Sequence, residues 1–328
     1  SDTSNVGGLM RAAIIDKNGP LDQLRIGELA APTPKADEIL VRVHAAALNP
    51  ADVKVVSGKD GGGFIHARKF PMALGFDFSG SVEEVGAKVT TRAVGEQVFG
   101  HLAYSPSTRQ GSLAEYVAVK PQAVGRKPAG VSHEDAAATA TAGCTALQVL
   151  RDKGRLQLGD HVLVNGASGG VGSFAVQIAR ALGAEVWGTA SAAKADFVRS
   201  LGATRVMDYR ETPLASIGET FDLLLDAAST SSFPKTRHLL ERGGAYVTLL
   251  PSLSLLGGMI LSLFSSKRCT VVTVQSRAAD LEQLGAWLSA GELQASVESV
   301  YPLAEVSDAL AALQSGAVRG KLAVRIGD

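Results

Sequence analysis

The sequence has few cysteines, few aromatic residues and no excess of charge of either sign. Cys144 and Cys269 are its only two cysteines. They are too few for a disulfide framework or a cysteine zinc site, so we expect a reducing, cytoplasmic setting. The 32 Lys and Arg residues balance the 32 Asp and Glu residues, whereas nucleic-acid-binding proteins usually carry a basic excess. We therefore expect a small molecule, and not a nucleic acid, as the partner.

The sequence also lacks a readable signal peptide, because no basic segment followed by an apolar run stands at its start. We expect Ser1–Leu9 to lie outside the fold. The stretch Gly243–Ser266 contains no charged residue and reaches the length of a membrane span. Pro251 and the pair Gly257-Gly258 interrupt it, so we expect no transmembrane span here but a covered loop or a subunit interface.

What is present is a β-rich first third followed by an alternation of strands and helices. Apolar runs between Gly, Pro and Asp predict strands at Arg11–Asp16, Ile39–Ala45, Phe76–Val85, Gln97–Phe99 and Ala114–Val119. A helix is expected from Ser132 to Leu150, interrupted at Gly143. From His161 onward, short apolar runs alternate with helical segments, including a helix at Phe233–Glu241 and a strand at Ala245–Leu250. This alternation predicts βαβ units and a parallel sheet.

The segment Val162–Gly172 carries two overlapping motifs between a strand and a helix. Read as a dinucleotide-binding loop, it is Ala167-x-Gly169-x-x-Gly172, in which glycines let the backbone approach a pyrophosphate at a helix N-terminus. Read one residue earlier, it is a nucleophile elbow with Ser168 as the nucleophile. An elbow serine needs a histidine later in the chain, and His238 is the only one. The dinucleotide reading is favoured, because it also expects the second strand that Ala184–Ala190 supplies.

The end of that second strand bears on the choice of cofactor. Sites for NAD usually place an acid there, but Gly188–Lys194 contains none. Ser191 and Lys194 could bind a 2′-phosphate, and Tyr209 and Arg210 follow the next strand.

Some residues match other motifs without the right context. Tyr116 and Lys120 have the spacing of a short-chain dehydrogenase pair, but on a strand they would lie about 13 Å apart. His44 and His66 are isolated, and we expect them to be hydrogen-bonded structural residues and not metal ligands.

Four segments together carry a resemblance to a known family: Leu48–Lys54 (Leu-Asn-Pro-Ala-Asp-Val-Lys), Leu74–Gly80, Ala167–Gly172 and Gly320-Lys321. With them the chain resembles the zinc-independent quinone oxidoreductase branch of the medium-chain dehydrogenase/reductases, the branch that includes zeta-crystallin. The resemblance implies an α/β subunit with two domains and NADPH in the cleft between them. A GroES-like distorted β-barrel catalytic domain is expected over 10–138 and 272–328, and a doubly wound Rossmann domain over 139–271. The family also implies a homodimer.

The resemblance assigns roles to individual positions. The expected catalytic residues, at the nicotinamide end, are Asn49, Asp52 and Lys54. The residues expected to bind the cofactor are Thr145, Ala167, Ser168, Gly169, Gly170, Val171, Gly172, Ser191, Lys194, Tyr209, Leu250, Val274 and Lys321. Related zinc alcohol dehydrogenases have Gly-His-Glu where this chain has Gly75-Phe76-Asp77, so no metal is expected.

The implied function is hydride transfer from NADPH to a quinone or to an α,β-unsaturated carbonyl (an enone or enal) without zinc. Such acceptors are already electron-poor and need no Lewis acid. Two alternatives stay open: an NADPH-binding sensor or adaptor without robust catalysis, and a serine hydrolase that uses Ser168.

Overall fold

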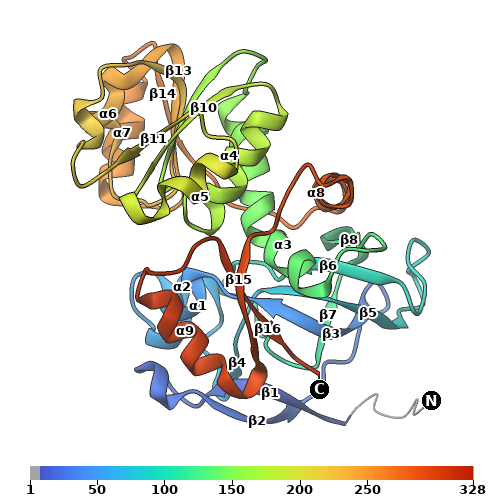
Figure 1. Cartoon of the computed structure of the whole chain (residues 1–328). Helices are drawn as coiled ribbons and strands as arrows, with labels where there is room; N and C mark the ends of the chain where they lie inside the picture. Colours follow the sequence, from blue (N-terminus) through green and yellow to red (C-terminus); the bar gives the residue numbers. More distant parts are fainter. Residues whose placement is uncertain (1–7, 328) are drawn as a thin grey trace. The chain divides into compact units, whose positions relative to one another are not determined.

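The computed structural model describes residues 8–327 and divides the chain into two units (Figure 1). One unit combines the described residues up to Thr141 with those from Gln275 onward, and the other is Ala142–Val274. Of the segment expected to lie outside the fold, residues 1–7 are outside the described part of the chain. Leu9 contradicts that expectation, because it starts a strand and pairs with Ala30.

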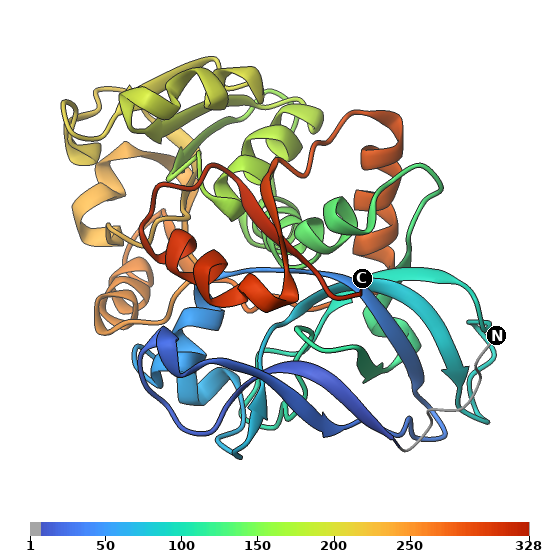
Figure 2. The same cartoon turned by 60° about the horizontal axis from the view of Figure 1, so that its bottom comes forward.

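The first unit is built on two sheets. The smaller has the order β2-β1-β4 and the larger the order β15-β16-β3-β5-β6-β8, with β7 also paired to β3. Figure 2 shows the C-terminal segment, in red, returning to the blue N-terminal strands, and β16 pairs with β3 in antiparallel register. The strands are β1 (Leu9–Ile15), β2 (Arg25–Ala30), β3 (Ile39–Ala47), β4 (Met72–Ala73), β5 (Asp77–Val85), β6 (Gln97–His101), β7 (Tyr116–Val119), β8 (Val124–Arg126), β15 (Val297–Pro302) and β16 (Lys321–Arg325).

The core of this unit is apolar and continuous across its strands and helices. Phe76, Phe78 and Val117 from the N-terminal part of the chain pack in one cluster with Leu310 and Val324 from the C-terminal segment. Burial of these side chains requires the tail, so both parts of the chain contribute to one hydrophobic core. The helices of the unit are α1 (Pro50–Ser57), α2 (Gly62–Ile65), α8 (Ala278–Ala290) and α9 (Val306–Gln314), and α3 (His133–Gln148) begins in it.

The second unit is a six-stranded parallel sheet with the order β11-β10-β9-β12-β13-β14. Counted along the chain this order is 3-2-1-4-5-6, so the strand order reverses next to β9 and leaves a binding position at the carboxyl ends of the strands. Its strands are β9 (His161–Asn165), β10 (Glu185–Ala190), β11 (Arg205–Asp208), β12 (Phe221–Asp226), β13 (Leu240–Thr248) and β14 (Arg268–Val271). Its helices are α4 (Gly170–Ala181), α5 (Ala195–Ser200), α6 (Phe233–Thr236) and α7 (Leu253–Ser262).

Three local expectations were wrong. Helix α3 is not interrupted at Gly143, because the glycine is buried inside the helix, where tertiary packing outweighs its low helix propensity. The helix expected over Phe233–Glu241 ends early, and β13 already starts at Leu240, which pairs with Phe221. Gly243–Ser266 was expected to be a covered loop or a subunit interface; the structure has helix α7 there and no covered loop, and the interface stays a prediction.

Helix α3 ends in a π-helical turn, Val149–Gly154, that one side chain holds in place. The guanidinium of Arg268 donates hydrogen bonds to the carbonyl oxygens of Lys153 (2.8 Å) and Gly154 (3.0 Å). A cation at this position satisfies carbonyl groups that the helix leaves unpaired and complements the negative end of its dipole. Arg268 on β14 therefore fixes this turn against the sheet.

A buried carboxylate joins four strands of the parallel sheet at their carboxyl ends. Asp226, at the end of β12, accepts hydrogen bonds from the side chains of Asn165 on β9 (2.7 Å) and Tyr246 on β13 (2.8 Å). It also accepts from two backbone N–H groups, those of Thr230 and Ser231. The oxygen of the Asn165 amide in turn accepts from Thr189 on β10 (2.6 Å). Both carboxylate oxygens of Asp226 thus accept two hydrogen bonds each. These bonds offset the free-energy cost of burying the carboxylate.

The hydrogen-bonded environment also changes the titration of the tyrosine. Burial and the neighbouring Asp226 carboxylate raise the pKa of Tyr246 well above its usual range. The phenol therefore keeps its proton and acts as a donor.

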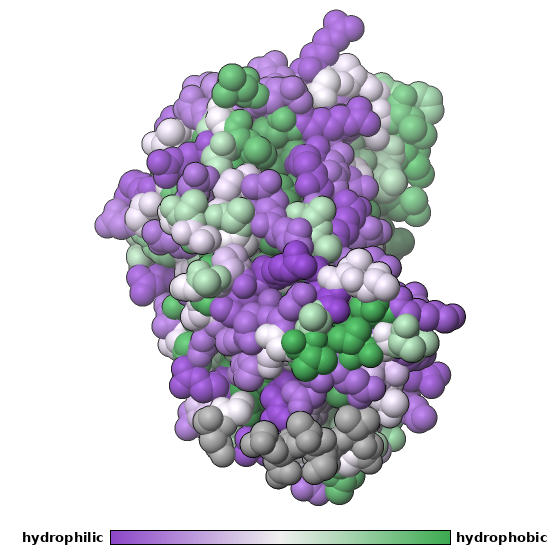
Figure 3. Space-filling model, turned by 90° about the vertical axis from the view of Figure 1, so that its right-hand side faces the viewer, coloured by the Kyte–Doolittle hydropathy of each residue, from purple (hydrophilic) through white to green (hydrophobic). Residues whose placement is uncertain are grey.

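The surface in Figure 3 is mostly hydrophilic, and its hydrophobic side chains form separate groups. Among residues 8–327 no helix combines the length and apolar character that crossing a bilayer requires.

We expect Asp226→Asn to lower the free energy of unfolding by roughly 2–4 kcal/mol, because it removes the charge and places an amide donor against other donors. Tyr246→Phe should cost only about 1 kcal/mol, because it removes one hydrogen bond. The measurement is urea unfolding followed by the fluorescence of Trp187 in a Trp287→Phe background. Trp187 reports on the second unit because it lies on β10 of the parallel sheet. Equal effects of the two substitutions would contradict this role for Asp226.

Candidate active site

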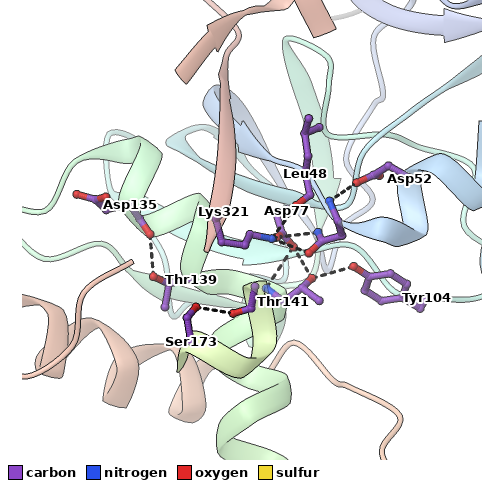
Figure 4. Close-up of polar contacts among 11 residues, drawn as sticks. Leu48, Asp52, Asp77, Tyr104, Asp135, Thr139, Thr141, Ser173 and Lys321 are labelled. Atoms are coloured by element: carbon purple, nitrogen blue, oxygen red, sulfur yellow. Dashed lines mark hydrogen bonds and ion pairs between the residues drawn. The ribbon is translucent and has the colours of Figure 1, made fainter. Parts of the chain in front are cut away.

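A buried lysine near the C-terminus closes a cluster of polar groups in the first unit (Figure 4). The ammonium group of Lys321 donates to the Leu48 carbonyl (2.8 Å) and the Asn49 amide oxygen (2.6 Å), and it lies 3.4 Å from the Asp77 carboxylate. These three acceptors use all of its protons. β16 can deliver the lysine here because it runs beside the end of β3, where the Leu48 N–H bonds the Leu322 carbonyl.

Asp77, the first residue of β5, is the counter-charge and is fully buried. One carboxylate oxygen accepts from Lys321 and from the Asn49 amide nitrogen (2.9 Å). The other accepts from the backbone N–H of Thr141 (3.2 Å) and from its hydroxyl. Because the Thr141 hydroxyl donates to Asp77, its oxygen accepts from the hydroxyl of Tyr104 (3.0 Å). The cluster is therefore a connected network with defined donors and acceptors.

Tyr104 lies flat against Phe76, with ring centroids 4.1 Å apart and an interplanar angle of 12°. Burial and the neighbouring Asp77 and Asp52 raise its pKa well above the ordinary value for tyrosine. The phenol is therefore a hydrogen-bond donor under all ordinary conditions.

The start of helix α1 holds the expected catalytic residues in fixed positions. Asn49 is extended (φ −130°, ψ 155°), and Pro50 follows at the first helical position, where its fixed φ suits a helix and its missing N–H costs nothing. The Asp52 carboxylate accepts from the Asn49 backbone N–H (2.7 Å). Since both ends of the Asn49 amide bind Asp77 and Lys321, this side chain is oriented by the cluster.

Asp52 is buried, and one of its oxygens has no hydrogen-bond partner in the described part of the chain. Burial raises its pKa to about 7, the nearby Asp77 adds to the rise, and the Asn49 N–H and Lys321 oppose it. Asp52 therefore gains or loses its proton near neutral pH.

Lys54, two residues further along α1, is only half-buried. Its ammonium group contacts no hydrogen-bonding or ionic partner among residues 8–327. A cation left unpaired on the helix that carries Asn49 and Asp52 is available to an anionic or carbonyl ligand.

The residues at this cluster do not fit a catalytic zinc ion. The carboxylate of Asp77 is saturated by internal donors, from Asn49, Thr141 and Lys321. The ammonium of Lys321 already sits at the carboxylate, where a second cation would be repelled. Within the described chain no three His, Cys, Asp or Glu side chains converge as metal ligands.

In the second unit, the glycine loop turns sharply between β9 and α4. Gly166 has φ +82°, which a side chain would strain, and a Cβ at Gly172 would lie only 2.1 Å from the Gly166 carbonyl oxygen. Helix α4 then begins after Gly169 with no side-chain cap, so the N–H groups of its first turn stay open to a ligand. An uncapped helix N-terminus at the reversal point of a parallel sheet fits the pyrophosphate of a dinucleotide.

The adjoining carboxyl ends of β10 and β11 are tied together by Asp208. Its carboxylate accepts from the backbone N–H groups of Ala192 (3.0 Å) and Arg210 (2.9 Å). This shapes the turn that carries Ser191 and Lys194, whose backbone groups bond each other. Tyr209 is half exposed beside this turn, with the Arg210 guanidinium 5.7 Å from its ring centre. The residues expected at a 2′-phosphate are thus neighbours here.

The geometry does not suit Ser168 as a nucleophile. A nucleophile elbow places its serine in a strained turn, but Ser168 is absent from the non-glycine residues with positive φ in the described part of the chain. The only later histidine, His238, bonds the Ala215 carbonyl (2.8 Å), and no histidine of residues 8–327 bonds Ser168. The hydrolase alternative therefore lacks its base.

The expected site residues fall into two groups. Asn49, Asp52 and Lys321 come together in the first unit, and Lys54 lies two residues beyond Asp52 on α1. The loop residues, with Ser191, Lys194 and Tyr209, line neighbouring strand ends in the second. In that unit Ala167 is buried and lies close to Gly188, and Thr145 is buried on α3. Leu250 lies shortly after the end of β13, and Val274 lies shortly after the end of β14.

The structure also settles the isolated motifs. His66 bonds two backbone carbonyls and His44 bonds the Ser81 hydroxyl, as expected of structural histidines. Tyr116 is buried on β7, whereas Lys120 lies beyond the strand and pairs with Asp37.

The roles of Asp77, Thr141 and Tyr104 were not predicted from the sequence. The signal available was an acid at the start of an otherwise apolar strand, since a buried carboxylate requires a partner. The identity of that partner could not be read locally, because Lys321 lies 244 residues from Asp77.

We expect Asp52→Asn to stabilise the protein relative to wild type increasingly as pH rises from 4 to 8, by up to about 4 kcal/mol. The folded-state pKa is raised, so in the wild type the stability present at low pH is lost as pH rises through about 7. The measurement is urea unfolding at several pH values, followed by Trp287 in a Trp187→Phe background. The exposed Asp60→Asn serves as a control and should stay within about 0.5 kcal/mol at every pH. A difference between Asp52→Asn and wild type that does not vary with pH would show that Asp52 titrates normally.

Comparison with known proteins agrees with this architecture. The family model described as "Alcohol dehydrogenase GroES-like domain" matches residues 35–129, and that described as "Zinc-binding dehydrogenase" matches residues 201–324. The chain is 33% identical to "NAD(P)H oxidoreductase RTN4IP1, mitochondrial" of Danio rerio, over 97% of this chain and 92% of that protein. It is 29% identical to the "2-methylene-furan-3-one reductase" of Solanum lycopersicum, over 99% of this chain and 81% of that protein.

Among solved structures, the quinone oxidoreductase from Coxiella burnetii is similar with a TM-score of 0.89 and 30% identity, over 97% of this chain and 100% of that one. These matches confirm the α/β fold with a GroES-like domain and a Rossmann-like parallel sheet, and they support an oxidoreductase that uses a nicotinamide cofactor. The chain belongs to the medium-chain dehydrogenase/reductase superfamily, in its quinone oxidoreductase branch.

Proposed function

We propose that this protein is an NADPH-dependent reductase that transfers a hydride to a quinone or to an α,β-unsaturated carbonyl without zinc. The observation that carries the proposal is the uncapped N-terminus of α4, which the Gly166 turn presents at the point where the strand order of the sheet reverses. Its open N–H groups and positive dipole end would hold the pyrophosphate through the backbone of Gly169, Gly170 and Val171.

The preference for NADPH rests on the turn after β10. No acid ends this strand, and Asp208, at the end of the neighbouring strand β11, is engaged by the N–H groups of Ala192 and Arg210. Ser191, Lys194 and Tyr209 would therefore meet a 2′-phosphate with a hydroxyl, a cation and a phenol.

The acceptor would be electron-poor. A bound reduced nicotinamide supplies the hydride, and the chain must orient the acceptor and stabilise the negative charge that develops on its oxygen. Without a metal ion, the cluster around Lys321 would polarise a substrate oxygen only weakly. An alcohol would therefore be a poor substrate, and a quinone or enone a good one. The names of the relatives from Coxiella burnetii and Solanum lycopersicum support these two acceptor classes.

The residues of the first unit would have different parts in this reaction. Lys54, with its unpaired ammonium, is the leading group to meet an anionic oxygen. Asn49 and Asp52 would act by position, because the amide of Asn49 is fixed by Asp77 and Lys321 and the carboxyl of Asp52 supports the start of α1. The enolate would take its final proton from water.

Two expectations stay predictions from the sequence. The family implies a homodimer. A cytoplasmic location rests on the two cysteines, and one compared relative is named as mitochondrial.

The proposal is tested by following nicotinamide oxidation at 340 nm with NADPH and with NADH. The acceptors are a 1,2-quinone, a 1,4-quinone and an alkyl vinyl ketone. We expect turnover that depends on NADPH, and the ranking of acceptors selects the quinone or the enone version. Tight binding of NADPH with no turnover on any acceptor would favour the sensor or adaptor alternative, and no binding at all would overturn the proposal.

We expect Lys194→Ala to raise the KM for NADPH about tenfold, because one charge-assisted contact to the 2′-phosphate is lost. The KM for NADH should not change, since NADH has no such phosphate. Steady-state kinetics with both cofactors measure the difference. Equal effects on the two cofactors would place Lys194 away from the 2′-phosphate.

A further inference from the structure

Helix α1 and the loops near its end carry an excess of positive charge. Residues 53–76 contain four Lys or Arg residues and only one acid, Asp60. Residues 101–114 contain one Arg and no acid. The five cations are Lys54, Lys59, Arg68, Lys69 and Arg109. Because the chain as a whole has no net charge, this local excess does not follow from its composition and indicates a negatively charged ligand.

The loops 58–70 and 103–110 pack against each other and form one surface, the basic loop pair. The Ala67 N–H donates to the Thr108 carbonyl (2.8 Å), and the Ser105 N–H donates to the Ile65 carbonyl (2.9 Å). Arg68 directly follows Ala67, and Arg109 directly follows Thr108. The two arginines therefore lie close together in space, although they are far apart in sequence.

Close backbone contacts fix the first of these loops on α1. Helix α2 lies beside α1 (Figure 1), and a Cβ at Gly62 would lie only 2.0 Å from the Lys54 carbonyl oxygen. The Arg68 guanidinium donates to the Gly58 carbonyl (3.1 Å), and a Cβ at Gly63 would lie 2.4 Å from the Arg68 Nε. Glycines at these positions make room for the helix and for the guanidinium. The loop thus holds Arg68 in a defined position at the end of α1.

Interactions within the chain do not account for this positive charge. Arg68 complements the carbonyl end of α1, but Lys59 and Lys69 are exposed and their ammonium groups contact no hydrogen-bonding or ionic partner among residues 8–327. Acids do occur on or next to the other segments that contact α1, namely Asp22, Glu305 and Asp308. The excess of cations therefore belongs to the basic loop pair and not to all the surroundings of α1.

An exposed aromatic side chain lies among these cations. Phe64, on α2, is 78% exposed, whereas the next residue, Ile65, packs against the core of the unit. Helix α2 thus directs one apolar side chain inward and an aromatic ring outward. An outward ring beside several cations suits a nucleotide, because the ring can stack on the base while the cations meet the phosphate groups.

We propose that the basic loop pair binds the nucleotide end of a coenzyme A thioester, and that the acceptor is an enoyl thioester. Lys59, Arg68 and Lys69 would meet the phosphate groups, and Phe64 would stack on the adenine. Helix α1 has eight residues, or a length of about 12 Å, and an extended pantetheine arm is longer than this. The nucleotide can therefore rest on the loops while the enoyl group reaches Asn49 at the start of α1.

This inference rests on the proposed function, because it names the acceptor of the same hydride transfer. The β-carbon of the enoyl group receives the hydride, and the electron pair of the double bond moves toward the thioester carbonyl. The enolate that results takes a proton from water at its α-carbon. NADPH is oxidised to NADP⁺, the carbon–carbon double bond is reduced to a single bond, and the thioester bond stays intact.

The test compares acceptors that share one reacting group and differ in charge. They are crotonyl coenzyme A, crotonyl phosphopantetheine and crotonyl pantetheine, and NADPH oxidation is followed at 340 nm. We expect a KM for crotonyl coenzyme A at least about tenfold below that for crotonyl pantetheine. The difference should shrink at high salt. Crotonyl phosphopantetheine should have an intermediate KM, because it carries a phosphate but no base.

The variant Lys59→Gln/Lys69→Gln tests the phosphate contacts. It should raise the KM for crotonyl coenzyme A about tenfold and leave that for crotonyl pantetheine unchanged. Lys88→Gln/Lys120→Gln is the matched control, because both lysines are exposed in other loops of the same unit. The control should behave like the wild type with both acceptors, and thermal unfolding of the two variants should match the wild type.

The aromatic contact has a separate test. Phe64→Ala should raise the KM for crotonyl coenzyme A about fivefold, because stacking on the adenine is lost. The KM for crotonyl phosphopantetheine should not change, since this acceptor has no base. An equal rise with both acceptors would show that Phe64 does not contact the adenine.

Three results would overturn the inference and leave the proposed function intact. Crotonyl coenzyme A and crotonyl pantetheine could have the same KM, or the two double lysine variants could have the same kinetics. Alternatively, an alkyl vinyl ketone could be reduced while crotonyl coenzyme A is not, with no binding of coenzyme A in titration calorimetry. Reduction of none of the acceptors would instead overturn the proposed function, and the calorimetry would still show whether the basic loop pair binds the nucleotide.

Discussion

The buried ion pair between Lys321 and Asp77 is the interaction on which the first unit depends. Taking two charges out of water is costly, and the cost is offset only when every remaining donor and acceptor is satisfied. Here Leu48, Asn49 and Thr141 complete the set, so the pair fixes the end of β3, the start of α1 and the middle of α3 at once. The same saturation leaves no acceptor on Asp77 free for a second cation. The chemistry proposed for the site follows from that choice of cation.

The second unit depends on a buried carboxylate too, but one that is held by hydrogen bonds and not by a cation. Asp226 has no ionic partner among residues 8–327 and is held by four neutral donors instead. These donors come from β9, β13 and the segment after β12. The carboxyl ends of the strands are thereby locked in register, and the glycine turn after Asn165 starts from a fixed position. A rigid sheet edge below an open helix N-terminus is what recognition of a phosphate requires.

The sequence predicted the classes of element well and the long-range polar contacts poorly. Periodicity located the parallel strands and the glycine loop, because both are properties of a few adjacent residues. The role of Lys321 could be anticipated only as a position near the cofactor, since its real partners are more than 240 residues away. Gly143 was misread for a similar reason, because packing around α3 outweighs local propensity. The uncharged stretch around α7 was noticed in the sequence, but only the structure separates its inner face from its outer one.

The position of Lys321 in the chain has a consequence for how the protein is made. Synthesis runs from the N-terminus, and domains generally fold as units when their residues become available. The unit Ala142–Val274 has all six strands of its sheet in one continuous stretch, so it can form while the tail is still being added. The barrel strands made first must wait for β16, and until then Asp77 has no cation to pair with. The central unit can therefore complete its fold before the unit that contains the first strands to be synthesised.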